Sequence, residues 1–186
     1  SLDWWGGFNP VQKYQRYDFL SEGDSPTFFM LLDTGLRTLE DVTNGGFSGR
    51  YAKADKKNSK GQEVNYWSPV KDTYVKEDGN TMQVESSWKY IDDIQNDFAS
   101  RADWCIVNDY AKANHAPKVS VTEGTDIKAS AGETLKLHAI ATDPDDDYVT
   151  VSWSEYTDAS TTETALTLKG AASDTISFKI PEDAKA

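Results

Sequence analysis

The sequence predicts an α+β chain in which a mixed, helix-containing first part is followed by a second part made of antiparallel strands. Composition changes near residue 116: most aromatic residues, the single cysteine and both methionines lie before it, whereas Thr, Ser, Ala, Val and Asp dominate after it. The change falls at "NHAPKVSV", where Pro117 disfavours a helical conformation at Ala116 and an alternating segment begins. We therefore expect two domains, residues 1–115 and 116–186.

The strands of the second part are predicted from apolar residues that alternate with polar ones. The alternation runs through residues 119–121, 135–141, 149–153, 166–168 and 176–180, with turn residues between. This pattern is typical of an antiparallel β-sandwich of immunoglobulin-like type, in which Trp153 occupies a position where an aromatic residue is often buried. About five strands are counted where roughly seven close such a sandwich, so we expect it to be incomplete, with closing strands absent or supplied from elsewhere.

Two helices are expected in the first part. "SPTFFMLLDTGL" has Asp24 or Ser25 as a possible N-cap, Pro26 in its first turn and Gly35 as a stop. From Ser86 to Asn114, apolar residues recur at helical spacing: Trp88, Ile91, Phe98, Ala102 and Cys105. The polar, glycine-containing stretch between them, residues 44–83, is expected to be irregular.

The charge of the chain excludes several classes of partner. A formal net charge of −12 over 186 residues argues against nucleic acid and anionic membranes, which both need clustered Lys and Arg. No apolar run reaches the roughly 20 residues of a membrane span, and we expect no signal peptide in the first residues given. The lone Cys105 excludes an internal disulfide, and its place on the apolar helical pattern favours a core residue over a nucleophile.

A series of motifs resembles a known family. "EGDSPTFF", "GGFSGRY", "WKYIDDIQNDFASRADWC", "ANHAP" and "ATDPDDDYVTVSW" occur in this order over nearly the whole chain. The series resembles a bacterial family described as nucleoside-hydrolase-like and labelled cellulose-binding. The resemblance implies an α/β domain related to nucleoside hydrolases, an immunoglobulin-like C-terminal module, export and a connection with polysaccharide use. The chain would then hold the last elements of the α/β domain, with the upstream part of that domain as a partner.

The resemblance also bears on catalysis. Nucleoside hydrolases bind Ca²⁺ with an N-terminal aspartate cluster, close to D-x-D-x-x-x-D-D, and a later Asp preceded by His. Nothing in the chain matches the first cluster, while Asp24 is similar in position to the later Asp and has Gly23 in place of the His. The resemblance makes Asp24 a ligand or substrate contact with Glu22 beside it. The residues alone favour a helix cap at Asp24 or Ser25 and a solvated Glu22.

A glycine-rich loop and several tryptophans are further candidates for a sugar site. In "GGFSGRY", Arg50 would bond sugar hydroxyls, and Trp67, Trp4 and Trp5 would stack on the apolar faces of sugar rings. The alternative is a buried turn in which Phe47 and Tyr51 fill the core and Arg50 pairs with an acid. We predict substrate binding by Glu22, Asp24, Arg50 and Trp67, with both interpretations open.

The acidic run "DPDDD" is a candidate metal site. Asp143, Asp145 and Asp147 alternate in it, and Ca²⁺ takes several oxygen ligands from such spacing. The alternative is a type I turn with Pro144 at its second position and aspartates bonded to their own backbone. His115 lacks a partner at metal-ligand or nucleophile spacing and is expected to be structural, at the junction of the two domains.

These observations predict a fragment of an exported bacterial glycan-related protein, secreted, periplasmic or at the cell surface. It would bind cellulose or another polysaccharide, or form part of a nucleoside-hydrolase-like glycosidase. We do not expect this chain alone to be active; a parent that hydrolyses N-glycosidic or glycosidic bonds stays open. The alternative function is a structural or adhesion β-sandwich module stabilised by calcium.

Overall fold

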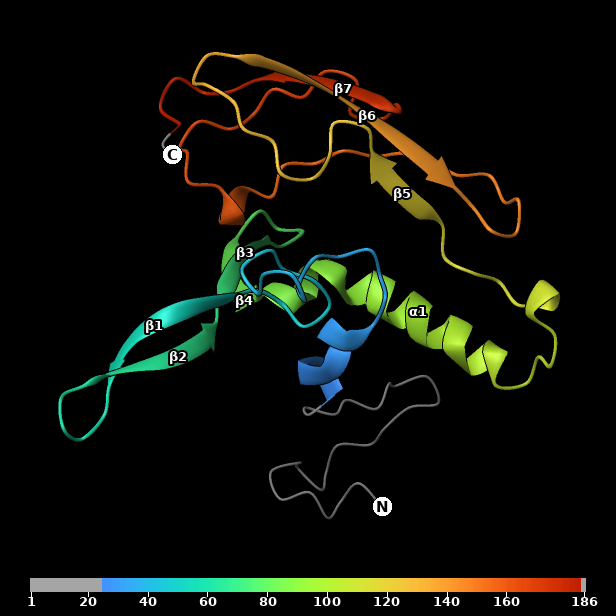
Figure 1. The fold of residues 1–186 in the computed structure, drawn as a ribbon, viewed down its shortest axis with the longest axis horizontal. Coiled ribbons are helices and arrows are strands. Elements are labelled where there is room, and N and C mark those ends of the chain that lie inside the picture. The colour runs from blue at the N-terminus through green and yellow to red at the C-terminus, as the bar shows by residue number, and fades with distance from the viewer. Residues whose placement is uncertain (1–24, 185–186) are drawn as a thin grey trace.

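The computed structural model describes residues 25–184 of the chain (Figure 1). It combines helical segments with small antiparallel sheets, which confirms the α+β class. In Figure 1 the C-terminal sheet lies at the top, two hairpins lie below it, and an α-helix extends to the opposite side from the hairpins. No helix among the described residues is long and apolar enough to cross a membrane.

Two β-hairpins occupy the stretch that was expected to be irregular, so that prediction is wrong. Strand β1 (Tyr51–Lys57) pairs with β2 (Glu63–Pro69), and β3 (Lys71–Val75) pairs with β4 (Thr81–Glu85), both antiparallel. No residue of β1 or β2 is buried, so these strands lack the apolar alternation that reveals a strand in a sequence. The available signals were Gly61 and Gly79, which adopt φ of 77° and 82° in the hairpin turns.

The predicted long helix is confirmed in its first two thirds. A 3₁₀ turn, η3 (Ser86–Tyr90), leads into α1 (Ile91–Trp104), and a second short turn, η4 (Tyr110–Lys112), follows after a break. The second turn begins where the Asp109 carboxylate accepts a hydrogen bond from the backbone N–H of Ala111. The other predicted helix is a 3₁₀ helix, η2 (Ser25–Leu31).

The apolar stripe of α1 faces outward in the described chain. No residue of α1 is buried, and Ile91 and Phe98 are 49% and 70% exposed. Cys105 is exposed as well, so the expectation that it fills a core is wrong. Helical periodicity thus predicted the helix correctly, but it cannot say which surface covers the apolar stripe.

The second part contains one three-stranded antiparallel sheet. Strands β5 (Lys118–Val121), β6 (Thr134–Thr142) and β7 (Thr175–Lys179) are ordered β5-β6-β7, with Leu137 opposite Ile176 in the register of β6 and β7. Ile176 and Ala139 are its most buried apolar residues, at 2% and 4% exposure. This sheet shares no strand with the two hairpins.

Two of the predicted strands do not form. Residues 149–153 and 166–168 are irregular, and the nearest ladder contact is an isolated bridge between Lys169 and Ser177. Trp153 is held by single hydrogen bonds, from its backbone N–H to Ala171 O and from its indole N–H to Ser173 O, both 2.8 Å. In these two segments the apolar residues alternate, but no neighbouring strand pairs with the backbone. A short 3₁₀ turn, η5 (Thr157–Ala159), lies in the same region.

Candidate functional site

The "GGFSGRY" loop packs tightly against η3. Gly49 has a φ of 79°, and a Cβ placed on it would lie 2.8 Å from Ser86 Oγ and 3.1 Å from the backbone nitrogen of Ser87. The next residue is tied to the same place, since the backbone N–H of Arg50 donates to Ser86 Oγ over 2.6 Å. Phe47 is only 7% exposed and its ring lies 6.1 Å from that of Tyr90. The loop is therefore a buried turn, and glycine is needed for both its backbone angle and its close approach.

Arg50 lies at the centre of a polar cluster that joins the two parts of the chain. Its guanidinium Nη2 donates to Asp72 Oδ1 over 2.7 Å and to the carbonyl oxygen of Asp158 over 2.9 Å. Its Nε donates to the hydroxyl oxygen of Tyr156 over 3.2 Å, and the Tyr156 hydroxyl donates to the other oxygen of Asp72. The Arg50 and Asp72 side chains are 13% and 8% exposed, so this ion pair is largely withdrawn from solvent.

The electrostatics of this cluster favour a neutral Tyr156. Burial, and then the hydrogen bond to the Asp72 carboxylate, raise the pKa of Tyr156 well above its ordinary value. Asp158 adds a further link, because its carboxylate accepts a hydrogen bond from the backbone N–H of Thr73 over 3.0 Å. The polar groups of this cluster bond to one another, and these bonds connect the β3–β4 hairpin to η5. The predicted contact of Arg50 with sugar stays a prediction.

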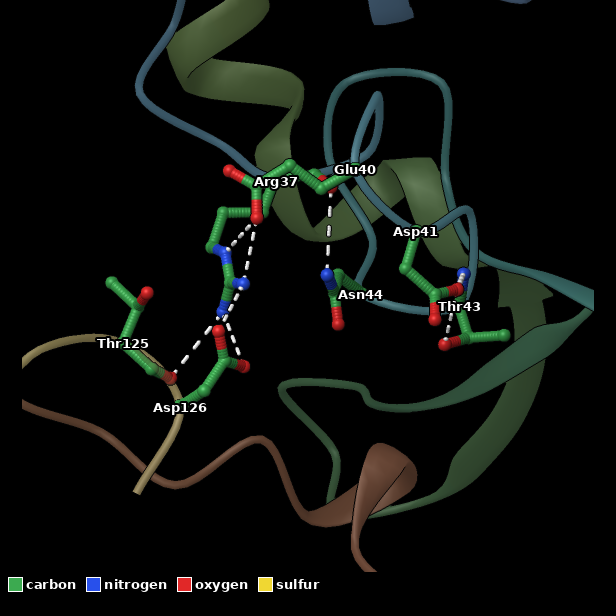
Figure 2. Close-up of polar contacts among 7 residues, drawn as sticks. All are labelled: Arg37, Glu40, Asp41, Thr43, Asn44, Thr125 and Asp126. Atoms are coloured by element: carbon green, nitrogen blue, oxygen red, sulfur yellow. Dashed lines mark hydrogen bonds and ion pairs between the residues drawn. The ribbon is translucent and has the colours of Figure 1, made fainter.

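A second ion-paired contact links the two parts. Figure 2 shows the guanidinium of Arg37 between Glu40 and Asp126. Its Nη2 and Nη1 donate to the two carboxylate oxygens of Asp126 over 2.8 and 3.2 Å, and its Nε donates to Glu40 over 2.7 Å. Beside it the Asp41 carboxylate accepts hydrogen bonds from the backbone and hydroxyl of Thr43, which lower its pKa. Both carboxylates compensate one arginine, so this contact is also structural.

Among the predicted sugar contacts that fall within residues 25–184, Trp67 is the exposed one. It lies on β2 opposite Lys53, and it is 41% exposed. Its neighbour Tyr66, 48% exposed, belongs to the opposite face of the hairpin because successive strand residues alternate. Each face of the β1–β2 hairpin therefore carries one exposed aromatic ring. The other predicted contacts in this region, Glu22 and Asp24 with Trp4 and Trp5, lie outside the described residues.

The "DPDDD" run forms a turn that is bonded to its own backbone. Asp143 Oδ1 accepts from the N–H of Asp145 over 2.8 Å and from that of Asp147 over 3.4 Å. Within residues 25–184 no group of three His, Cys, Asp or Glu side chains is arranged to hold a metal ion. Calcium binding by Asp143, Asp145 and Asp147 stays a prediction.

Asp145 has a partner that the sequence did not predict. Its carboxylate accepts from the backbone N–H of His115 over 2.5 Å and lies 2.9 Å from His115 Nδ1. These bonds hold the pKa of Asp145 below its ordinary value. His115 is thus a structural residue between the two parts, as expected, and a carboxylate from the acidic turn fixes it. Hydrogen bonds between residues thirty positions apart leave no local signal in a sequence.

The comparisons with known proteins match both ends of the chain. Residues 9–51 match the family model "Cellulose-binding Sde182, nucleoside hydrolase-like domain", and residues 134–186 match "Cellulose-binding protein Sde0182, C-terminal domain". The family resemblance is confirmed. The first match contains the Arg50 loop, and the second contains the acidic turn and strands β6 and β7.

A solved structure supports the same conclusion. It is a nucleoside hydrolase-related hypothetical protein from Saccharophagus degradans that is associated with carbohydrate metabolism. The two chains are 27% identical with a TM-score of 0.66, and the match covers 91% of the present chain. It covers 42% of that protein, so the chain spans less than half of the neighbour's length. The comparison with curated proteins finds no significant match.

Proposed function

We propose that this chain is a polysaccharide-binding part of an exported bacterial protein. The observation that carries the proposal is the pair of family matches, one at each end of the chain, to proteins described as cellulose-binding. The similar protein from Saccharophagus degradans is associated with carbohydrate metabolism, which points to the same class of ligand. The net charge of −12 agrees with a neutral glycan rather than a polyanion.

Trp67 supplies the contact surface in this proposal. Its indole is accessible on a hairpin, and Lys53, Asp55 and Asn65 share its face by the β1–β2 register. A neutral sugar offers an apolar C–H face to an aromatic ring and hydroxyl groups to nearby donors and acceptors. Binding to one such open platform is expected to be weak, because little area is buried and a flexible glycan loses entropy on ordering.

The upstream part of the α/β domain is the expected partner of the first part of the chain. The support is an exposed apolar stripe: Trp88, Ile91 and Phe98 are 52%, 49% and 70% exposed. A stripe of this kind is normally covered by another element. The neighbour is also more than twice as long as the matched region. Any hydrolysis of glycosidic bonds is assigned to the parent protein in this proposal and not to this chain.

The C-terminal sheet and the location of the protein complete the proposal. We take β5, β6 and β7 as part of an immunoglobulin-like sandwich whose closing strands come from elsewhere, in line with the match of residues 134–186 to a C-terminal domain. Secretion, or a periplasmic or cell-surface location, follows from the need to meet an insoluble polysaccharide. Direct fractionation of the producing cells tests this part.

Retention on insoluble glycan is the test of the binding function. The wild type is incubated with microcrystalline cellulose and other plant polysaccharides, and the bound fraction is measured after washing. The proposal predicts retention that Trp67→Ala weakens about tenfold, or about 1.4 kcal/mol. The matched control is Tyr148→Ala, because Tyr148 is 93% exposed and lies in the other part of the chain. Absence of retention on every glycan contradicts the proposal.

A further inference from the structure

A cavity of about 450 Å³ lies at the C-terminal end of α1. Its walls include Trp104 from the last turn of the helix, Val107, Asn108 and Asp109 from the following loop, Tyr110 from η4, and His115. Ligand sites in proteins have volumes of about 300–1,000 Å³ and combine aromatic walls with a few polar groups. The size and composition of this cavity therefore match a small-ligand site.

The aromatic wall of the cavity is fixed before any ligand arrives. The indole N–H of Trp104 donates to the carbonyl oxygen of Asn114 over 2.8 Å. The ring centroids of Trp104 and His115 are 5.7 Å apart, and those of Tyr110 and His115 are stacked at 3.8 Å. His115 is in turn held by Asp145 through its backbone N–H and Nδ1. Such preorganisation lowers the entropy lost when a ligand binds.

The helix side of the wall is held as well. The Arg101 guanidinium lies 5.4 Å from the centroid of the Trp104 ring, in cation–π range. Arg101 is fixed by Asp97, whose carboxylate accepts from Nε over 2.6 Å and from Nη2 over 3.2 Å. Although one face of Tyr110 is stacked on His115, the residue is 72% exposed, so the rest of its ring is accessible.

Polar groups stand beside the rings. Asn108 is exposed and its side chain makes no hydrogen bond to another residue within 25–184. Asp109 uses one carboxylate oxygen to cap η4, while the other lies 3.6 Å from Lys112 Nζ. An amide supplies both a donor and an acceptor, and a carboxylate supplies acceptors, which suits hydroxyl groups. The same carboxylate opposes a phosphate or another anion.

We propose that this cavity binds one sugar ring of a neutral glycan, with the Tyr110 ring stacking on the apolar face of the sugar and Asn108 and Asp109 bonding its hydroxyls. The inference rests on the proposed function and adds a second binding position to it. This position lies at the junction between the predicted domains, whereas Trp67 lies on the β1–β2 hairpin. Two weak contacts on one polysaccharide chain would reinforce each other by raising the effective concentration.

The test is an NMR titration of the intact chain with a soluble β-1,4-linked glucose hexasaccharide. The expected result is a dose-dependent shift of the Trp104 indole N–H and His115 ring resonances. Tyr110→Ala should weaken this response about tenfold, whereas Tyr110→Phe, which keeps the ring, should retain it. In the Trp67→Ala variant the Trp104 and His115 signals should still shift on titration, and circular dichroism verifies that each variant is folded.

The outcomes separate this inference from the proposed function. If the Trp67 indole shifts and the Trp104 and His115 signals do not, the cavity is not a sugar site while polysaccharide binding stands. If adenosine shifts the Trp104 and His115 signals and the hexasaccharide does not, the ligand class is wrong. If the Trp67, Trp104 and His115 signals all stay in place and the wild type is not retained on any glycan, both proposals fail.

Discussion

Tyr156→Phe tests whether the Arg50 cluster holds the two parts of the chain together. The change removes only a hydroxyl group, which donates to the Asp72 carboxylate and accepts from Arg50 Nε. Hydrogen bonds to charged groups contribute about 1.5–3 kcal/mol each. Because Asp72 keeps its bond to Arg50 Nη2, we expect the lower half of this range, a loss of about 2 kcal/mol. That corresponds to a fall in Tm of about 4–8 °C for a chain of this size.

Urea unfolding followed by tryptophan fluorescence, together with a thermal scan, measures this loss. The control is Tyr148→Phe, since Tyr148 is 93% exposed and the same substitution there should change the free energy of unfolding by less than about 0.5 kcal/mol. If Tyr156→Phe is no more destabilising than this control, the Arg50–Asp72–Tyr156 cluster is not the joint we describe. An Asp72→Ala variant should cost more, about 3–5 kcal/mol, because it leaves the buried Arg50 charge without its partner.

Four further predictions concern neighbouring features. Because Tyr156 has a raised pKa in the folded state, the wild type should lose stability as pH rises above about 10, and Tyr156→Phe should lose less; equal slopes in urea unfolding contradict this. Because Asp145 has a lowered pKa, its stabilisation should be present above about pH 4 and lost below it; Asp145→Asn should flatten this acid loss, and a parallel profile would refute the His115 contact. If the acidic turn binds Ca²⁺, EDTA should lower the Tm of the wild type but not that of Asp145→Ala. An unchanged wild-type Tm would contradict calcium binding and favour a turn bonded only to its own backbone. Gly49→Ala should destabilise the chain more than Gly79→Ala, since both have positive φ but only Gly49 has close neighbours; equal thermal shifts would remove the packing argument.

Helical periodicity predicted the helix well because its signal is local. The apolar residues between 88 and 105 indicated the helix, and α1 with η3 occupies Ser86–Trp104. The predicted helix continued to residue 114, whereas α1 ends at Trp104 and a separate short turn follows, capped by the Asp109 carboxylate. The exposure of the apolar stripe could not be predicted, because the sequence of a helix does not show which other segment packs against it.

Strands were predicted less well: some were missed, and some that were predicted do not form. The hairpins at 51–85 went unrecognised because exposed strands such as β1 and β2 carry polar residues on both faces. Residues 149–153 alternate well but find only isolated bonds to the loop at 171–173. Alternation reports which side chains prefer burial, whereas strand formation needs a neighbouring backbone with free hydrogen-bonding groups.

The candidate sites show the same limit. The sequence left two interpretations of the "GGFSGRY" loop open, a sugar-binding loop and a buried turn with an ion pair. Phe47 is buried and Arg50 is ion-paired, as the second interpretation expects. Their partners Asp72 and Tyr156 were not predicted, because they come from distant segments and have no distinguishing local motif. The aromatic cavity at Tyr110 was missed for a different reason: Trp104, Tyr110 and His115 are close in the sequence, but a continuous helix was predicted there, and their rings meet only because α1 ends at Trp104.

Quantitative retention on microcrystalline cellulose, compared among wild type, Trp67→Ala and Tyr148→Ala, tests the proposed polysaccharide binding most directly. Trp67 is exposed on a hairpin whose residues are all at least partly accessible, so its removal should spare the fold. The account predicts a saturable bound fraction for the wild type and for Tyr148→Ala, with about tenfold weaker binding for Trp67→Ala. Wild-type protein that stays wholly in the supernatant, on cellulose and on every other polysaccharide tried, would contradict it.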